Sequence, residues 1–213
     1  MTTPIQSAID CADVAGRRPS VKLQPEEYVV STLSVGNSLG GIVGTGGQAS
    51  TQLTHKTGAN GALLTWDSVT RNQRMHFSDL YLEGNDEVGE TYGLDLTGFS
   101  YSRFDSIRIR LFESAGMYGD GDTTASPVQQ ISNNTFIHCT FNNNDNGIIM
   151  DTTETPYNYN RWTANTFISC EIAGNTTIGL DIRTGSSNYF LGCTIQGNGK
   201  DIECNGNRNV FTG

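Results

Sequence analysis

A short phrase of alternating apolar and polar residues, opened by phenylalanine, recurs along the chain. In its first five copies an apolar residue or cysteine stands three positions after the phenylalanine, and another apolar residue stands two positions later. The phenylalanines lie 21 to 32 residues apart: Phe77, Phe104, Phe136, Phe167, Phe190 and Phe211. Alternation of this kind predicts short strands. Its repetition predicts a solenoid in which each copy is one coil.

Between these phrases lies a second pattern, a glycine followed by alternating apolar residues. It reads GALLTW from Gly61, GLDLT from Gly93, GIIMD from Gly147 and GLDIR from Gly179, with a degenerate KDIEC from Lys200. Each repeat is therefore predicted to contain at least two strands. The phenylalanine phrase also fits the leucine-rich repeat, whose period is about 20–29 residues. Two intervals exceed that range, leucine is scarce and the glycine-led half is poor in helix formers, so the pattern favours a parallel β-helix over a leucine-rich horseshoe.

Stacking the repeats places asparagines and cysteines in columns. One asparagine column lies eight positions after the phenylalanine and another lies two positions before it: Asn85, Asn144, Asn175, Asn198, and Asn134, Asn165, Asn188, Asn209. Asparagine tolerates left-handed backbone and can hydrogen-bond from coil to coil, which favours a structural role. Cys139, Cys170 and Cys193 share one inward column without disulfide geometry and are predicted to be reduced core residues. No cysteine or histidine cluster has zinc spacing, so we expect no metal site and no cofactor.

The N-terminal segment is predicted to cap the stack, whose open end would otherwise expose a hydrophobic cross-section. Thr3-Pro4-Ile5-Gln6 starts an amphipathic helix that Gly16 stops. Residues 1–20 are therefore assigned to a capping helix and residues 21–213 to the β-helix of the same domain. Because the chain stops at 209–213 as another coil begins, we expect a truncated stack or a partner over that end. The glycine-rich run from Gly40 lacks the lysine of a phosphate-binding loop, which argues against a nucleotide site.

The order of elements at the start resembles that of pectate-lyase-like parallel β-helix proteins, especially phage tailspikes and tail-fibre depolymerases. The segments IQSAIDCADVAG, VKLQPEEY and IVGTG carry the resemblance, together with the phrases from Phe77 onward. It implies an all-β, single-stranded, right-handed parallel β-helix with a short capping α-helix. It also implies a homotrimer in the virion, contacts with other tail proteins, and binding or cleavage of a bacterial surface polysaccharide. The paired aspartates of polygalacturonases and the R-x-P-x-x-R element of pectate lyases are missing, so no catalytic residue carries over.

The composition narrows the classes of partner. The chain has 213 residues, with 13 Lys and Arg against 22 Asp and Glu and a formal net charge of −9. Nucleic-acid binding is disfavoured, because a backbone-binding surface needs clustered basic side chains. No stretch approaches the roughly 20 apolar residues that span a bilayer, and the first ten residues lack the features of a signal peptide. We therefore expect synthesis in the host cytoplasm, no membrane insertion, and a neutral or weakly charged partner.

Candidate chemistry lies in the outward columns of the glycine-led strands. Aligning these strands puts Asp120 and Asp151 on neighbouring coils, with Arg183 one coil further. Two carboxylates about 5–5.5 Å apart suit a retaining glycosidase, and wider pairs suit an inverting one. The predicted catalytic residues are Asp120 and Asp151, with Asp122 or Glu154 as second partner. Solvated loop acids, bridged by arginine or a calcium ion, are the alternative.

Aromatic side chains near these acids are candidates for sugar contact. Tyr118 is predicted to be a stacking platform, and the run PYNYNRW adds Tyr157, Tyr159, Arg161 and Trp162. Arg183 completes the predicted carbohydrate-binding set. The alternative is that Trp162 packs on the flank and the tyrosines face a neighbouring subunit. The sequence therefore predicts a tailspike-like polysaccharide depolymerase, a hydrolase rather than a lyase. A non-catalytic adsorption protein of the virion and a bacterial lyase or hydrolase on the same fold stay open.

Overall fold

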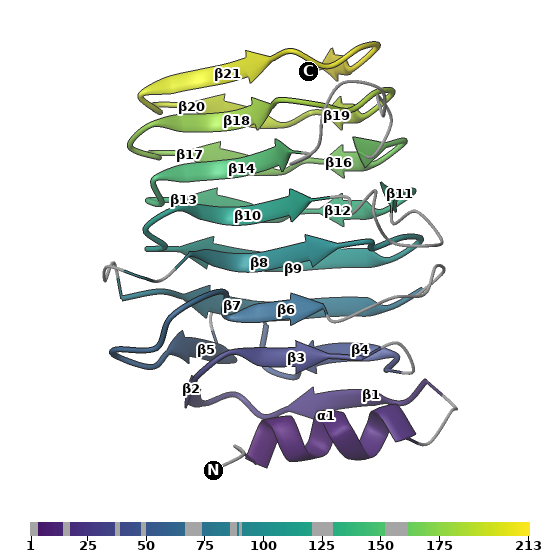
Figure 1. The fold of residues 1–213 in the computed structure, drawn as a ribbon, viewed down its shortest axis with the longest axis vertical. Coiled ribbons are helices and arrows are strands. Elements are labelled where there is room, and N and C mark those ends of the chain that lie inside the picture. The colour runs from purple at the N-terminus through teal and green to yellow at the C-terminus, as the bar shows by residue number, and fades with distance from the viewer. Residues whose placement is uncertain are drawn as a thin grey trace.

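The computed structural model describes residues 4–14, 18–36, 39–47, 50–66, 74–85, 89, 91–120, 130–151 and 162–213. Its strands stack as the coils of a parallel β-helix, which runs from a helix at the N-terminal end to the last strands at the other (Figure 1). Every described strand pair is parallel and joins strands of different coils. The predicted fold class is confirmed.

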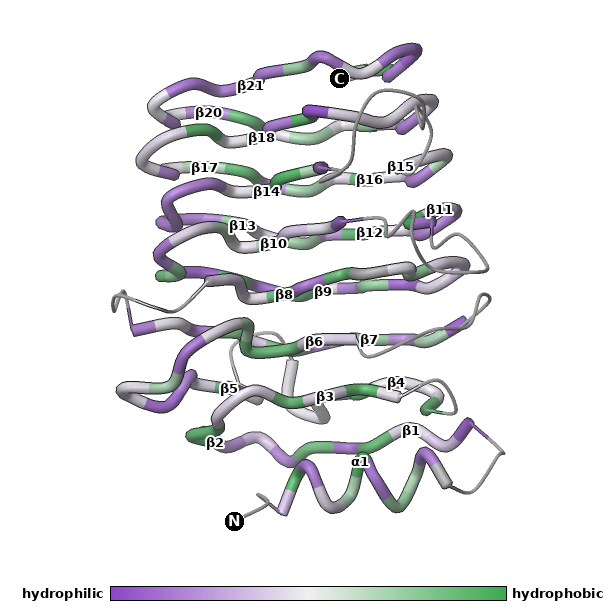
Figure 2. The backbone as a smooth tube through the Cα atoms, viewed as in Figure 1, coloured by the Kyte–Doolittle hydropathy of each residue, from purple (hydrophilic) through white to green (hydrophobic). Residues whose placement is uncertain are grey.

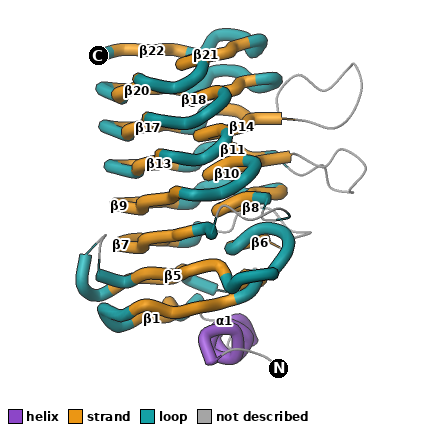
Figure 3. The backbone as a smooth tube through the Cα atoms, turned by 90° about the vertical axis from the view of Figure 1, so that its left-hand side faces the viewer, coloured by secondary structure: helices purple, strands orange, loops and turns teal. Residues whose placement is uncertain are grey.

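Two sheets form the long layers of the stack (Figures 1 and 3). The glycine-led strands build most of the seven-stranded sheet, which also includes β3 from the first coil. Its strands are β3 (Leu33–Val35), β6 (Leu64–Trp66), β8 (Tyr92–Thr97), β10 (Ala115–Asp120), β14 (Asn146–Asp151), β18 (Ile178–Ile182) and β21 (Lys200–Cys204). A two-stranded sheet at one corner joins β11 (Ile131–Ser132) to β15 (Trp162–Thr163). Of the functional candidates, Tyr118, Asp120 and Asp151 lie on outward positions of the seven-stranded sheet, and Arg183 directly follows β18.

The phenylalanine phrases build the 13-stranded sheet, together with the strands of the first coils. Its main path is β1 (Ser20–Leu23), β4 (Gly41–Gly44), β7 (His76–Glu83), β9 (Arg103–Arg110), β12 (Thr135–Ile137), β16 (Thr166–Ile168), β19 (Tyr189–Leu191) and β22 (Val210–Thr212). A branch beside it holds β2 (Glu27–Val30), β5 (Gln52–His55), β13 (Thr140–Asn142), β17 (Glu171–Ala173) and β20 (Thr194–Gln196). The long β7 and β9 serve both paths.

Three columns of left-handed residues turn each later coil. Their φ angles lie between 50 and 67°: Asp79, Ser106, His138, Ser169, Gly192; Tyr101, Asn133, Ala164, Ser187, Arg208; and Leu111, Asn143, Gly174, Gly197. The first column falls two residues after each phenylalanine, so each phrase bends there and its later copies divide into two strands. A left-handed non-glycine residue costs roughly 1–2 kcal/mol, which the contacts between coils must offset.

The phenylalanines form a continuous stack through the core. Each of the six is the register partner of the next. From Phe104 to Phe211 successive ring centroids are 4.5 to 4.8 Å apart and the rings are tilted by only 5 to 9°. In Figure 2 apolar and polar segments alternate along the strands of each coil, as this packing requires. Cys139, Cys170 and Cys193 lie beside the stack as free thiols, which confirms the predicted reduced core residues.

Two asparagine ladders run parallel to the axis. From the second member of each ladder on, each asparagine Oδ1 accepts from the backbone N–H and the Nδ2 of the asparagine one coil before, at 2.8 to 3.2 Å: Asn134, Asn165, Asn188, Asn209, and Asn144, Asn175, Asn198. The first members, Asn134 and Asn144, accept from the N–H groups of Ser102 and Phe112. The structural role predicted for these columns is confirmed. Asn85, aligned with the second ladder by sequence, instead donates to the backbone oxygen of His55.

The helix α1 (Pro4–Val14) lies across the first coil (Figure 3). Ile5 and Ile9 are buried against the core, as the predicted apolar face requires. Gln6 fixes the helix to the edge strand β3, because its amide accepts from the Ser34 N–H at 2.9 Å and donates to the Ser34 oxygen at 3.0 Å. Across the described residues, no helix is long and apolar enough to span a membrane.

Two features of the first coils were not predicted from the sequence. The run from Tyr28 to Val35 divides into β2 and β3 at Ser31 and Thr32, because the chain turns there from one sheet to the other. The strand β5 was not predicted, since its short segment carries neither repeated phrase. The N-terminal coils are therefore less regular in sequence than those that follow.

Candidate functional site

The outward columns of the seven-stranded sheet align as predicted. Tyr118 pairs in register with Asp95 on one side and Ile149 on the other. Asp120 pairs with Asp151 on the next coil. Both aspartates are the last residues of their strands, β10 and β14, so they lie at the same edge of the sheet. Their backbones are therefore one strand spacing apart, about 4.8 Å.

Arg183 ties the carboxylates of two coils together. Its Nη1 is 2.6 Å from Asp151 Oδ2, and its Nε is 2.7 Å from Asp181 Oδ2. The side chain of Asp181 is only 4% exposed, while that of Asp151 is 19% and that of Arg183 is 47% exposed. A buried carboxylate needs such a partner, because removing its charge from water is costly. The guanidinium therefore fixes the orientation of Asp151 as well as stabilising Asp181.

Two tyrosines stack beside these charges. The rings of Tyr92 and Tyr118 are parallel to within 12°, with centroids 4.4 Å apart, and both are half-buried. Burial raises the pKa of Tyr118, and the nearby Asp120 and Asp151 raise it further. Burial and Asp95 raise the pKa of Tyr92 in the same way. Both phenols therefore stay protonated and can donate hydrogen bonds.

Opposing effects act on the charge of Arg183. Partial burial lowers its pKa, but the hydrogen bonds to Asp181 and Asp151 raise it by more, so the net shift is upward. The guanidinium is therefore a permanent cation among the aspartates. We call the residues Tyr92, Tyr118, Asp120, Asp151, Asp181 and Arg183 the tyrosine–carboxylate strip. It offers flat apolar surface, hydroxyl donors and paired acids on adjacent coils.

The structure brings together four of the residues predicted from the sequence, namely Tyr118, Asp120, Asp151 and Arg183. It adds Tyr92 and the pairing of Asp181, which the sequence analysis did not single out. The signal for Tyr92 was its place before the glycine of a glycine-led strand. Five further predicted residues lie outside the described ranges: Asp122, Glu154, Tyr157, Tyr159 and Arg161.

The prediction that Trp162 contacts sugar is wrong. Its side chain is fully buried, and its indole N–H donates to the backbone oxygen of Gly119 at 2.9 Å. The ring fits against Gly119, where a side-chain carbon would lie 2.1 Å from its Cζ2. Trp162 therefore packs into the core, and not on the flank as the alternative interpretation expected, because an indole gains more from burial than from exposure.

Gly119→Ala is expected to displace the Trp162 ring and destabilise the fold by about 1–3 kcal/mol, the usual effect of overpacking. Tryptophan emission should shift to the red as the indole loses its dry environment. The matched control adds Trp162→Leu, which removes the clashing ring atoms. The alanine should then have a much smaller effect, because the two sites are in contact. Additive losses in urea unfolding would contradict this packing.

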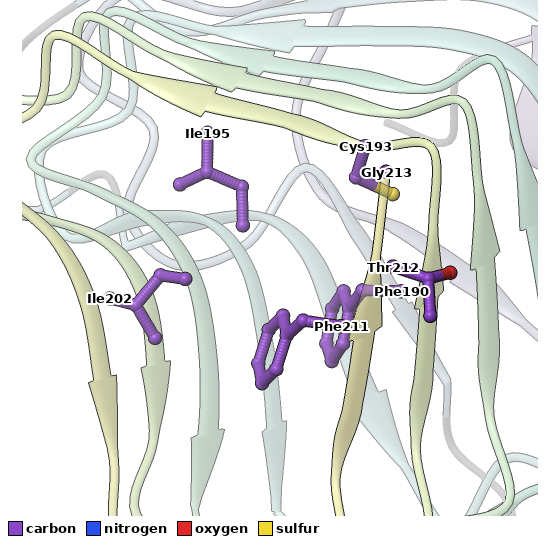
Figure 4. A pocket seen from close by; sticks show the side chains of 7 residues that line it. All are labelled: Phe190, Cys193, Ile195, Ile202, Phe211, Thr212 and Gly213. Atoms are coloured by element: carbon purple, nitrogen blue, oxygen red, sulfur yellow. The ribbon is translucent and has the colours of Figure 1, made fainter.

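A cavity of about 270 Å³ lies at the C-terminal end of the stack (Figure 4). Phe190, Cys193 and Ile195 line it from one coil, and Ile202 and Phe211 from the last strands. These side chains continue the core columns, and Ile202 and Phe211 are 38% and 41% exposed. The cavity is therefore the exposed end of the hydrophobic core, and its lining residues form no cluster of catalytic polar groups. Among the described residues, no group of three or more His, Cys, Asp or Glu is placed to hold a metal ion.

No protein-family model and no curated protein matches the chain. Solved structures do match its fold. ORF18 of Geobacillus virus E2 has a TM-score of 0.70 at 18% identity, over 97% of this chain and 43% of that one. The tailspike gp49 of Acinetobacter baumannii bacteriophage Fri1, a capsular polysaccharide depolymerase, has a TM-score of 0.64 at 15% identity, over 99% and 46%.

A third match is the A-module of the mannuronan C-5 epimerase AlgE4 of Azotobacter vinelandii, with a TM-score of 0.55 at 16% identity, over 97% of this chain and 71% of that one. The chain spans less than half the length of the two phage proteins. At these identities the likeness concerns the fold and not the site. The chain therefore has the right-handed parallel β-helix fold that the phage tailspike and the epimerase module share.

Proposed function

We propose that the chain belongs to a phage tail appendage, where it binds a bacterial surface polysaccharide and cleaves it as a glycoside hydrolase. The observation that carries the proposal is the tyrosine–carboxylate strip, which stacks Tyr92 and Tyr118 beside acids on successive coils. An aromatic ring packs on the apolar face of a sugar, while its hydroxyl and the neighbouring carboxylates bond the sugar hydroxyls. A strip along the axis suits an extended chain of sugars.

Asp151 is oriented by Arg183, and we assign it as the nucleophile that attacks the anomeric carbon. Asp120, one coil away, protonates the leaving oxygen. Water then hydrolyses the glycosyl–enzyme ester while Asp120 takes its proton, which is the retaining mechanism. Asp122 and Glu154 stay alternative partners, and Tyr157, Tyr159 and Arg161 stay proposed sugar contacts.

Two of the similar structures support a polysaccharide as the substrate. Fri1 gp49 is a capsular polysaccharide depolymerase and AlgE4 acts on mannuronan, and both have this fold.

A small β-helix also exposes a long flank, which association of copies would bury. We therefore propose a homotrimer that contacts other tail proteins in the virion. Light scattering of the purified protein tests the trimer, and a monodisperse monomer would refute it.

The test of activity is a screen against capsular, lipopolysaccharide and exopolysaccharide preparations, with reducing ends and unsaturated-uronate absorbance read in parallel. Release of reducing ends alone supports the hydrolase. Both signals together indicate a lyase and refute the carboxylate pair. Binding without release would assign the chain to adsorption, a role in which the ion pairs of Arg183 with Asp151 and Asp181 serve as a structural clamp.

Tyr118→Ala is expected to weaken binding of the polysaccharide identified in this screen about tenfold, since removal of one stacking platform costs on the order of 1–1.5 kcal/mol. Surface plasmon resonance on immobilised polysaccharide measures the change. Tyr101→Ala is the matched control, because Tyr101 is 52% exposed and lies outside the strip. Equal losses in the two variants would refute the assignment of Tyr118.

A further inference from the structure

Arginines cover a tyrosine on the outer face of the 13-stranded sheet, away from the tyrosine–carboxylate strip. The guanidinium carbons of Arg108 and Arg110 lie over the ring of Tyr81, 5.5 and 5.2 Å from its centroid. The tyrosine is only 8% exposed, so these side chains form a flat layer over it. Such cation–π contacts hold a guanidinium parallel to the ring and leave its N–H groups at the edge.

The guanidinium of Arg110 is paired with a carboxylate within this layer. Arg110 donates to Glu83 Oε1 from Nε at 3.0 Å and from Nη2 at 2.6 Å. The hydroxyl of Tyr81 also donates to Glu83 Oε1, at 3.2 Å, and Gln52 donates to its other oxygen. Glu83, Arg110 and Tyr81 therefore form a fixed base on β7 and β9.

Arg108 differs, because its charge has no partner of opposite sign. Within the described part of the chain its Nε is shielded from solvent yet bonds to no acceptor, and no carboxylate lies within ion-pair distance. On the next coil Asn142 has a shielded Oδ1 that accepts no hydrogen bond. Thr140 stands in register with Arg108, and Asn142 stands in register with Arg110. An unmet donor and an unmet acceptor thus lie on adjacent coils, and each costs roughly 1–3 kcal/mol while it is unsatisfied.

We propose that Tyr81, Arg108, Arg110, Thr140 and Asn142, the arginine strip, form a second glycan-binding site that takes a carboxylated sugar residue such as a uronic acid. Because Arg108 Nε and Asn142 Oδ1 are shielded, a sugar carboxylate is expected to bond the Nη groups of Arg108, and a neighbouring ring hydroxyl the amide nitrogen of Asn142. Thr140 offers a hydroxyl between them. The site does not rest on the proposed hydrolase, since it uses a different face and different residues.

The charges of the two faces support this assignment. In the arginine strip Glu83 pairs with Arg110, so Arg108 is left without an ion pair among the described residues, although Glu171 stands in register with Thr140 at the edge of the strip. The tyrosine–carboxylate strip sets the three acids Asp120, Asp151 and Asp181 against Arg183 alone. A carboxylated sugar is therefore repelled by the acids of the tyrosine–carboxylate strip and attracted by Arg108 in the arginine strip. In a chain of net charge −9, Arg108 is a local exception that favours an anionic residue.

The experiment titrates the full chain with oligogalacturonate of about six residues by calorimetry, with maltoheptaose and carboxyl-reduced oligogalacturonate as neutral probes. We expect binding of the acidic probe alone. Arg108→Gln should weaken it at least about tenfold, since a charge-assisted hydrogen bond contributes about 1.5–3 kcal/mol. Asn142→Ala should weaken it by a smaller factor and serves if the first variant is unstable. Arg103→Gln is the matched control on the same strand, because Arg103 is paired with Asp105 and 51% exposed.

Other outcomes would overturn the site. No binding of oligogalacturonate, or equal binding of the neutral probes, would exclude recognition of a sugar carboxylate. Binding of a glycerol-phosphate oligomer in its place would assign the strip to phosphate. If Tyr118→Ala weakens binding of oligogalacturonate as much as Arg108→Gln does, the acidic probe binds at the tyrosine–carboxylate strip. If Tyr118→Ala retains binding, the arginine strip is independent of the proposed hydrolase. A changed molar mass of Arg108→Gln in light scattering would make the strip an interface between copies.

Discussion

Asn165→Ala is expected to lower the free energy of unfolding by about 3–6 kcal/mol, although it removes no apolar surface. Asn165 is fully buried and holds two coils together. Its Oδ1 accepts from the N–H and the Nδ2 of Asn134 at 3.1 and 3.0 Å. Its Nδ2 donates to Asn188 Oδ1 and to the oxygen of Ile131, both at 3.0 Å. Alanine removes these bonds from the Asn134 N–H and the Ile131 oxygen, and each buried group left unpaired costs about 1–3 kcal/mol. Asn188 Oδ1 keeps the backbone N–H of residue 165, and Asn134 Nδ2 keeps the Phe99 oxygen.

Urea unfolding followed by circular dichroism measures this loss for Asn165→Ala. The matched control is Asn205→Ala at an exposed position of the last coils, which should change stability by less than about 0.5 kcal/mol. A loss below about 1 kcal/mol for Asn165→Ala would show that water replaces the amide. The ladder would then not hold the coils in register.

The register of the later coils could be predicted because the repeated positions repeat their surroundings. A phenylalanine in each coil stacks on the one below, so any slip by one residue would turn Phe136 or Phe167 outward. The asparagines follow left-handed residues at fixed places and are equally constrained. The first coils lack these columns. The strand β5 and the break after β2 depend on where the chain crosses between sheets, which no local pattern of residues records.

The candidate site was only partly predictable for a related reason. Asp120, Asp151 and Arg183 fall in one outward column because the strands β10, β14 and β18 keep a common register. Trp162 stands outside that register, and its burial depends on the space that Gly119 leaves on another coil. Tyr92 was missed because Gly93 and Leu94 both face the core, so the simple alternation of sides fails at that point.

Asp151→Asn and Asp120→Asn are each expected to reduce kcat on the cleaved polysaccharide by about 10²–10⁴-fold, the usual contribution of a positioned acid or nucleophile. Binding should change little, because the amide keeps the shape of the carboxylate and Tyr92 and Tyr118 still stack on the sugar. For Asp151→Asn the ion pair with Arg183 is lost, but Asp181 still holds the guanidinium at 2.7 Å. The tyrosine–carboxylate strip should therefore keep its structure and lose its catalytic activity.

The matched control is Asp145→Asn, an exposed aspartate on the same coil just before β14, whose turnover should equal that of the wild type. Initial rates of reducing-end release give kcat, and plasmon resonance gives binding. Full activity of both asparagine variants would exclude Asp120 and Asp151 as the catalytic pair, and Asp122 and Glu154 would then be the acids to replace. If binding falls in parallel with the rate, Asp120 and Asp151 support the structure of the sugar site and are not catalytic.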